Sequence, residues 1–449
     1  MSVALRQARR GATPPAESGE WRNWAGDQAC RPAAIEHPAS AAEVADAIGR
    51  ARAAGRVVRV TGAGHSFTDA ALTDGTLLRL DRMRQVLEVD GTSGLARVEA
   101  GISLSELSEA LWAHGLALEN LGDIDVQSIA GATATGTHGT GSRLRNLSAG
   151  LRELELVTGD GSVVRVSERD DPDAWRAARV SVGALGVVTA VTLQAVPAFT
   201  LEGVDATAPL EEVLGRVDEL ADGAEHFEFY VFPHSPLALT RTNRRVDQTP
   251  EPPSRARAWV DDVLLRNHVF GLACAAGRRA PRLIPQINRL LARASGTTRR
   301  VDRSYRIFAS PRLVRFTEME YALPRERAAE AVRAVLDVAS RRGFAVPFPI
   351  EVRFVAADDA FLSPAGGRET CYIAVHMYRG MEWEPYFRAV EEVMNGFEGR
   401  PHWGKRHFQT AATLAPRYPD WERFQGVRRR LDPDGVFENG YVRRVLGES

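Results

Sequence analysis

Residues 128–141 read Ser128-Ile-Ala-Gly-Ala-Thr-Ala-Thr-Gly-Thr-His-Gly-Thr-Gly141, and most side chains in this stretch are small. Side chains of this size cannot fill a hydrophobic core by themselves, because protein interiors are close-packed. They allow the backbone to lie flat against a large planar or phosphorylated ligand. The alternative is a glycine-rich loop that packs on a neighbouring helix. The stretch therefore predicts a ligand-binding segment in the first half of the chain.

A second glycine-containing segment, Thr61-Gly-Ala-Gly-His-Ser-Phe67, directly follows a predicted strand at 56–60. Glycines after a strand let backbone amides approach a phosphate closely. The dinucleotide-binding fingerprint of nicotinamide-dependent enzymes would need a third glycine where this chain has Phe67. The turn is therefore a phosphate-binding candidate that does not fit that fingerprint.

Strands and helices are mixed along the chain without strict alternation, which predicts an α+β fold. Capping boxes at 40–43 and 103–106 predict two early helices, and Gly159-Asp-Gly161 predicts a hairpin turn. The pattern changes near residue 200. We expect a mobile tail at 1–22, a first domain at 23–198 and a second domain at 199–449. Later strands are expected at 227–232, 315–321, 349–355 and 372–378, and helices at 210–220, 326–340 and 384–395.

Composition excludes several classes of protein. The 449 residues carry a formal net charge of −1, which removes the electrostatic case for nucleic acid or an anionic membrane as a bulk partner. Three cysteines, Cys30, Cys274 and Cys371, are too few and too far apart for a disulfide framework. The chain has no run of about 20 apolar residues and no signal-peptide core at its start, so we expect a cytoplasmic protein without a membrane span.

Lysine usage singles out one residue. Of the 57 basic residues, Lys405 is the only lysine. A guanidinium can replace an ammonium on the surface, but it cannot do so in a tight polar pocket. Lys405 is therefore a candidate functional residue, and the alternative is a surface lysine retained by chance.

Glu351-Val-Arg353 lies on a predicted strand, where alternation points both charged side chains to one face. Such a pair can act on one substrate, although on an exposed strand it would be a solvated salt bridge. His402 and His407 lack metal-ligand spacing, so we expect no metal site. No Gly-x-Ser-x-Gly nucleophile motif is present.

Taken together, these segments resemble the sugar-1,4-lactone oxidases and the related alditol oxidases, within the vanillyl-alcohol-oxidase group of flavoproteins. The resemblance runs from about Asn23 to Gly447. Residues 62–67 resemble the flavin-attachment turn of the family, 120–122 with 129–141 a second flavin segment, and 177–189 a third. Residues 402–405 and 437–444 resemble its C-terminal signatures.

The resemblance implies a first domain that binds FAD and a second domain that covers the flavin ring, with 400–449 returning to the flavin. His65 falls where relatives bond a ring nitrogen covalently to the flavin. The other residues implied to bind the cofactor are Thr61, Gly62, Ala63, Gly64, Ser66, Ser128, Gly131, Thr135, Gly136, Thr137, His138, Gly186, Val188 and Lys405.

The resemblance also implies hydride transfer from a carbinol carbon to flavin N5. Glu351 and Arg353 would hold and polarise the substrate hydroxyl, Lys405 would stabilise negative charge, and His376 would support the site. Gly122 lies where a side chain could obstruct dioxygen, which favours an oxidase that forms hydrogen peroxide over a dehydrogenase.

Asp123 and Tyr378 depart from the residues expected in polyol-oxidising relatives, so we expect a sugar-1,4-lactone of the L-gulono or D-arabinono type, oxidised at C2. Four alternatives remain open: a lactone dehydrogenase that uses another electron acceptor, an alditol oxidase, a nicotinamide-dependent reductase, and a non-catalytic flavin- or sugar-binding protein.

Overall fold

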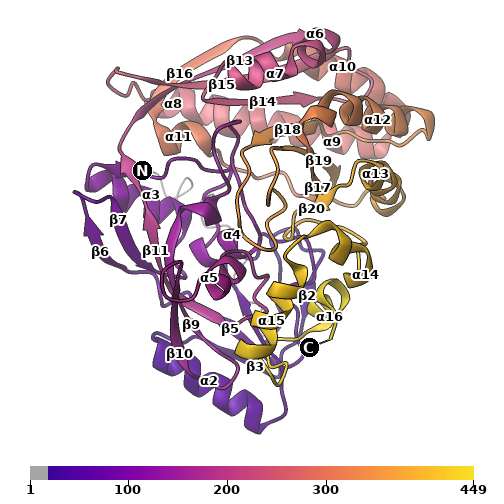
Figure 1. The fold of residues 1–449 in the computed structure, drawn as a ribbon. Coiled ribbons are helices and arrows are strands. Elements are labelled where there is room, and N and C mark those ends of the chain that lie inside the picture. Colours follow the sequence, from indigo (N-terminus) through magenta and orange to yellow (C-terminus); the bar gives the residue numbers. More distant parts are fainter. Residues whose placement is uncertain (1–18, 449) are drawn as a thin grey trace.

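The computed structural model describes residues 19–448 of the chain (Figure 1). Most of the expected mobile tail, residues 1–18, lies outside the described residues. Trp21–Arg22, expected at the end of that tail, form strand β1 and pair with β2, Ala29–Cys30. Across the described residues, no helix is both long and apolar enough to cross a lipid bilayer.

The turn at 61–66 follows a small parallel sheet. The strand order is β3-β5-β4, and helix α2 connects β3 to β4. Helix α2 begins after Ser40, whose side chain accepts a hydrogen bond from the Glu43 amide, as the capping box predicts. The bounds are β3 Ala34–Glu36, α2 Ala41–Ala53, β4 Val58–Thr61 and β5 Thr76–Arg79.

A five-stranded antiparallel sheet completes the first part of the molecule, in the order β10-β9-β11-β7-β6. The predicted capping box opens α3, with Ser103 and Glu106 bonded reciprocally. The small-residue stretch at 128–141, for which no helix was predicted, begins with a short helix, α4, because alanine favours helix and Ser128 caps it. The bounds are β6 Val86–Asp90, β7 Leu95–Glu99, α3 Leu104–Ala113, β8 Leu116–Ala117, α4 Ile129–Ala134, η1 Leu147–Gly150, β9 Leu151–Val157, β10 Val163–Ser167, α5 Pro172–Arg179, β11 Val187–Gln194 and β12 Val196–Pro197.

The second part is built on an eight-stranded antiparallel sheet in the order β16-β13-β15-β14-β18-β19-β17-β20. The helix expected at 210–220 is divided into α6 and α7 at Arg216. The bounds are β13 Thr200–Pro209, α6 Leu210–Gly215, α7 Val217–Asp222, β14 His226–Val231, β15 Leu237–Val246, β16 Thr298–Arg303, α11 Ser304–Phe308, β17 Phe316–Pro324, η4 Arg325–Arg327, α12 Ala328–Arg341, β18 Ile350–Val355, β19 Thr370–Tyr378, α13 Glu384–Gly396 and β20 Arg400–Pro401.

The two faces of this sheet differ sharply. One face packs its alternate residues, such as Phe229, Val352 and Val375, against α6, α7, α12 and α13. The intervening residues of β14, β17, β18 and β19 point to the opposite face, because strand side chains alternate. That opposite face is polar and covers the first part of the molecule, where the candidate site lies.

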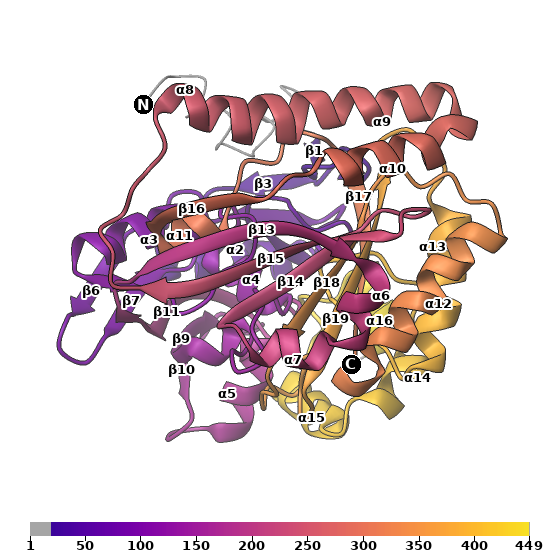
Figure 2. The ribbon, with the colours of Figure 1, turned by 90° about the horizontal axis from the view of Figure 1, so that it is seen from above.

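Residues 255–294 form a helical pair that the sequence patterns did not predict. A continuous rod, α8 (Arg255–Ala258), the π-helix η2 (Trp259–Val269) and α9 (Phe270–Arg279), runs along one edge of the molecule (Figure 2). After η3 (Pro281–Leu283), helix α10 (Ile284–Ala294) folds back beside α9. The π-helical segment does not follow the 3.6-residue period that identifies an amphipathic α-helix, which explains why the pattern was missed.

The C-terminal segment packs against the first part of the chain. Trp403, Tyr418, Trp421 and Tyr441 share one hydrophobic core with Trp175. The buried Arg59 side chain adds polar ties, because it donates hydrogen bonds to the carbonyl oxygens of Ala70, Val182, Gly183 and Phe437. The bounds are α14 Ala411–Leu414, η5 Ala415–Arg417, α15 Trp421–Leu431 and α16 Gly440–Leu446.

Candidate active site

A cavity of about 820 Å³ lies between the polar face of the eight-stranded sheet and the segments around 65–67 and 122–138. Its walls come from both halves of the chain, so the predicted site residues, which are distant in sequence, meet in space. The predicted residues that line it are His65, Ser66, Gly122, Asp123, Thr135, Thr137, His138, Glu351, Arg353, His376 and Lys405.

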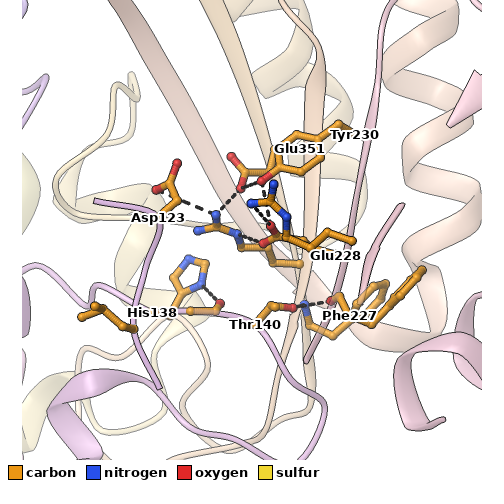
Figure 3. A network of polar contacts seen from close by, with 12 residues as sticks. Asp123, His138, Thr140, Phe227, Glu228, Tyr230 and Glu351 are labelled. Atoms are coloured by element: carbon orange, nitrogen blue, oxygen red, sulfur yellow. Dashed lines mark hydrogen bonds and ion pairs between the residues drawn. The ribbon is translucent and has the colours of Figure 1, made fainter. Parts of the chain in front are cut away.

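Strand register creates a buried charged cluster on the sheet face. In the pairing of β14 with β18, Glu228 lies opposite Arg353 and Tyr230 lies opposite Glu351. Arg353 Nε donates to Glu228 Oε2 at 2.8 Å, and its Nη2 forms an ion pair with Glu351. The Tyr230 hydroxyl lies 2.8 Å from Glu228 and 3.2 Å from Glu351 (Figure 3). The predicted Glu351–Arg353 pair is therefore buried and not a solvated salt bridge.

The acidity of Glu351 is strongly shifted. Burial raises the pKa of Glu351 to about 7, the Arg353 guanidinium opposes the shift, and the carboxylates of Asp123 and Glu228 add to it. A carboxyl group with a pKa near neutrality can accept a proton from a substrate hydroxyl and release it again. Glu351 is thus suited to general base catalysis.

Asp123 reaches the cluster from the first part of the chain. It accepts hydrogen bonds from Arg312 at 3.1 and 2.5 Å, and its other oxygen lies 3.8 Å from Arg353 Nη2. Burial alone would raise the pKa of Asp123, but the two guanidinium groups lower it well below its usual range. Asp123 is therefore a charged residue of the cavity wall, and Figure 3 shows it in the same polar network as Glu228 and Glu351.

Lys405 is held at the cavity by a second carboxylate. Its ammonium forms an ion pair with Glu318 and lies 5.4 Å from the centre of the Phe67 ring. Burial alone would lower the pKa of Lys405, but Glu318 and Glu320 outweigh it and raise that pKa. The sole lysine of the chain is thus a fixed cation in a confined polar site.

His376 shares Glu318 with Lys405. Its Nδ1 lies 3.1 Å from the carbonyl oxygen of Pro349, which can only accept, so Nδ1 carries a hydrogen. Its Nε2 lies 3.5 Å from Glu318, which raises the pKa of His376 even though burial opposes the shift. His376 therefore has a fixed ring orientation beside the substrate cavity.

A third group of titratable residues lies beside Lys405. His138 Nε2 is 3.3 Å from Glu320, and His402 completes a trio whose possible ligand atoms all lie within 4.8 Å of one another. Sequence spacing gave no sign of this trio, because its members come from three distant segments. Glu320 is paired with His138. Burial lowers the pKa of His402 to about 3, although the neighbouring Glu320 carboxylate opposes the shift.

The lower wall of the cavity carries a ring nitrogen without a partner. His65 stacks on Trp24 at 5.0 Å between ring centres, and its buried Nε2 has no hydrogen-bond partner among residues 19–448. Burial lowers the pKa of His65 to about 3, and Lys405 adds to the shift. A neutral imidazole with a free lone pair beside a large cavity fits the attachment position of a flavin.

The backbone around His65 also fits a large ligand. Gly62 and Gly131 are exposed, and both lie against Ser128 Oγ: an added Cβ would come within 2.2 Å of it from Gly62 and 3.0 Å from Gly131. The turn at 61–66 and the segment beginning at Ser128 therefore lie side by side without bulky side chains between them. Thr61, Ala63, Gly64 and Gly136 belong to the same two segments.

Gly122 lies close to the 137–138 backbone. An added Cβ would come 3.1 Å from the His138 carbonyl oxygen and 3.8 Å from Thr137 Cγ2. A side chain at this position would occupy space at the cavity wall. This location is compatible with the prediction that a side chain at position 122 could obstruct dioxygen.

Three predicted residues lie elsewhere. Gly186 is packed against β9, where an added Cβ would come 2.7 Å from the Val157 carbonyl oxygen. Val188, on β11, packs against two hydrophobic clusters of the first part of the molecule. Tyr378 stacks on Phe348 at 6.5 Å between ring centres, and Phe348 lines the cavity in its place.

Several residues of the site were missed from the sequence. Glu228 and Tyr230 alternate with the core residues Phe227 and Phe229, and Glu318 and Glu320 alternate with Met319 in the same way. A carboxylate at every second position of an otherwise hydrophobic strand was the available signal. Arg312 lies in an irregular segment and gave none.

Comparison with known proteins agrees with this geometry. Residues 191–445 match the family model of D-arabinono-1,4-lactone oxidase, and residues 32–167 match an FAD binding domain. In fold, the chain is similar to cholesterol oxidase from B. sterolicum, with a TM-score of 0.78 at 19% identity over 95% of this chain and 96% of the other. The molecule is a two-domain flavoprotein of the vanillyl-alcohol-oxidase type.

Relatives with similar sequences narrow the class. The chain is 54% identical to L-gulono-1,4-lactone dehydrogenase of Mycobacterium tuberculosis, covering 95% of this chain and 99% of the relative. It is 35% identical to mouse L-gulonolactone oxidase (95% and 98%) and 35% identical to the alditol oxidase of a Streptomyces species (94% and 98%). The chain belongs to the sugar-1,4-lactone oxidase family of FAD-dependent oxidoreductases.

Proposed function

We propose that the protein oxidises the C2 hydroxyl of a sugar-1,4-lactone of the L-gulono or D-arabinono type. The observation that carries this proposal is that the buried Glu351–Arg353 pair and the half-buried Lys405 line one cavity in a chain of this family. When bound, FAD supplies the two-electron oxidant that accepts the hydride from the carbinol carbon.

The side chains of the protein supply the remaining chemistry. Glu351, with a pKa of about 7, accepts the proton of the hydroxyl. Arg353 and Lys405 donate hydrogen bonds to the oxygen as negative charge develops on it, and they do so from fixed positions in a site that largely excludes water. The substrate thereby loses a hydride and a proton and becomes a ketone.

A cyclic lactone is favoured over a linear alditol, which is the second candidate substrate. The paired Asp123 and Arg312 form a rigid charged wall beside Arg353, and this wall limits the space for an extended chain. The relative with 54% identity is named for L-gulono-1,4-lactone, whereas the alditol oxidase shares 35% identity.

Anaerobic mixing of the purified holoenzyme with aldono-1,4-lactones and with alditols tests the substrate. We expect lactones to bleach the flavin absorbance, and xylitol or sorbitol to leave it unchanged. Bleaching by alditols alone would assign the enzyme to the alditol oxidases. A flavin that dithionite bleaches but neither substrate class does would refute both.

We also propose that the flavin is bound covalently through His65. The unpartnered, neutral Nε2 at the cavity wall supports this. Precipitation in acid tests it: flavin should stay with the protein pellet and move to the supernatant in His65→Ala. Flavin released from the unsubstituted protein would refute the bond.

For the electron acceptor we propose dioxygen, with formation of hydrogen peroxide, because Gly122 leaves the cavity wall open. A dehydrogenase that uses another acceptor is the second candidate, and the name of the 54% identical relative favours it. The two differ in how fast the reduced enzyme reoxidises in air.

Gly122→Ala provides the matching test. The added methyl group would lie 3.1 Å from the His138 carbonyl oxygen, so it would narrow the wall and shift the 137–138 backbone slightly. We expect turnover with oxygen to fall about tenfold and turnover with an artificial dye acceptor to change little. An equal fall with both acceptors would contradict a role in oxygen access.

A further inference from the structure

The helical pair at 255–294 carries a high positive charge, although the net charge of the whole chain is close to zero. The segment contains eight arginines and two aspartates, a formal charge of +6, so the rest of the chain carries −7. Both aspartates, Asp261 and Asp262, are half-buried and line the cavity. Asp261 pairs with Arg257 and Asp262 with Arg300, so the charges of the helical pair that have no partner within residues 19–448 are all positive.

Six of these arginines are exposed, do not line the cavity and form no ion pair with any carboxylate within residues 19–448. Elsewhere on the surface, arginines such as Arg216 and Arg333 are paired with glutamates. The six arginines are Arg255, Arg278, Arg279, Arg282, Arg289 and Arg293.

The same face exposes large hydrophobic side chains. Seven of the eleven such residues found over the described chain lie between 259 and 290. Two of them, Leu265 and Val269, also line the cavity, but the other five are exposed to the outside. The five are Trp259 (45% exposed), Val260 (39%), Leu272 (72%), Leu283 (51%) and Leu290 (67%).

We propose that this face, formed by α8, η2, α9 and α10, docks on the surface of an anionic lipid bilayer. A basic amphipathic helical surface with tryptophan and leucine on it binds such bilayers, since the apolar side chains enter the headgroup region and the arginines meet anionic lipids. The rod lies along the outer edge of the molecule, where a flat surface can reach its full length (Figure 2).

Other occupants fit this face less well. A second copy docked by the same face would set +6 against +6, and like charges across an interface are unfavourable. Nucleic acid would use the arginines but would leave the exposed leucines without a role. The helical pair also forms one wall of the cavity, so the docking face and the substrate cavity share the same helices.

Vesicle flotation of the full holoenzyme tests the proposal. We expect binding to vesicles of phosphatidylcholine with phosphatidylglycerol, little binding to phosphatidylcholine alone, and weakening by salt. Arg279→Gln/Arg282→Gln/Arg289→Gln should reduce partitioning on the order of tenfold to a hundredfold, because each arginine near the surface contributes about 1 kcal/mol. Leu272→Gln/Leu290→Gln should also weaken binding.

Matched control variants carry their substitutions outside residues 255–294. Arg31→Gln/Arg169→Gln/Arg341→Gln removes three exposed arginines, and Leu87→Gln/Leu95→Gln removes two exposed leucines. The controls should bind as the unsubstituted protein does, and flavin content should be normal in all variants.

Equal losses in control and test variants, or equal binding to both kinds of vesicle, would overturn the proposal. So would self-association that Leu272→Gln/Leu290→Gln abolishes in the absence of vesicle binding. The proposal does not depend on the substrate, because binding is measured without turnover.

Discussion

At the residue scale, the amino-acid composition and the position in the structure both single out Lys405. Lys405 is the only lysine of the chain, and its side chain is held between Glu318 and the Phe67 ring at the cavity. In a chain that otherwise uses arginine for its positive charges, we expect this confined position to need the smaller cation.

Lys405→Arg should therefore lower kcat by a factor on the order of 10² to 10³, while the protein still folds and binds flavin. The positive charge is kept, but the planar guanidinium cannot occupy the same space between Glu318 and Phe67. Steady-state kinetics with the lactone identified by flavin bleaching measures the effect. Arg341→Lys, on the surface, is the matched control, and near-normal turnover in Lys405→Arg would exclude the role.

The pKa of Glu351 gives a pH dependence with a definite sign. If Glu351 accepts the substrate proton, only its ionised form is active, so kcat/KM should rise with pH through about 7 and then level off. Glu351→Gln should lose this rise along with most of its activity. The exposed Glu211→Gln serves as control, and an unchanged inflection in Glu351→Gln would assign the titration to another group.

The raised pKa of Glu351 also makes folding stability depend on pH, and this contribution falls as the pH rises, whereas activity is expected to increase. Folding raises the pKa of Glu351 above its ordinary value of 4.5, so the folded state binds the proton more tightly. The stabilisation from this group is fully present below pH 4.5 and is lost as the pH rises through about 7. The site therefore has its active form under conditions in which Glu351 no longer contributes to folding.

At the element scale, the pairing of β14 with β18 sets the geometry of Arg353. Glu228 receives the Arg353 Nε hydrogen bond directly across the strand pair. Glu228→Gln keeps the shape but removes the charge, so we expect Arg353 to shift toward Glu351 and Asp123.

The expected result is a rise in KM of roughly tenfold for the lactone, in line with the loss of about 1–2 kcal/mol from one charge-assisted hydrogen bond. The control is Glu225→Gln, a carboxylate near the start of the same strand that pairs with Arg245 away from the cavity. Unchanged kinetics in Glu228→Gln would show that Arg353 is positioned by the other carboxylates.

Elements whose signals are local were predicted well from the sequence. The capping boxes predicted for α2 and α3 depend on residues three positions apart. The reciprocal pair is complete in α3, whereas in α2 Ser40 caps the Glu43 amide and the Glu43 carboxylate accepts from the Ala39 amide instead. Partners set by strand register could not be predicted in this way. Glu228 meets Arg353 only because two strands 125 residues apart pair in one particular register, which a single strand does not encode.

At the scale of the whole molecule, Arg59 joins segments that are far apart in the sequence. Its guanidinium donates to four carbonyl oxygens, including Phe437 in the C-terminal segment, and the side chain is buried. Burial lowers the pKa of Arg59 to about 10, so the group stays charged at neutral pH.

Arg59→Met should lower the free energy of unfolding by about 2–5 kcal/mol, because it leaves several buried carbonyl oxygens without a donor. Urea denaturation of the holoenzyme followed by circular dichroism measures this. The exposed Arg169→Met should change stability by less than about 0.5 kcal/mol. Equal midpoints for the two variants would show that water can replace the Arg59 hydrogen bonds.

The net charge of the chain was a poor guide at this scale. A net charge of −1 indicated no anionic partner, yet it is the sum of +6 on one segment and −7 on the rest of the chain. The structure places this segment as a helical pair along one edge of the molecule, with six of its arginines exposed. Local charge distribution, and not the total, determines what such a surface attracts.

In the sheet strands that border the cavity, side chains alternate between the core and the cavity, and this division affects how readily the protein can evolve. Along β14, β17, β18 and β19, alternate side chains pack in the core, and several of those between them, such as Tyr230, Glu318 and His376, line the cavity. Replacing Tyr230, Glu318 or His376 therefore alters the chemistry of the pocket without disturbing the packing beneath it. A scaffold divided in this way can acquire new substrates one substitution at a time, and libraries confined to these positions are the natural starting point for redesign.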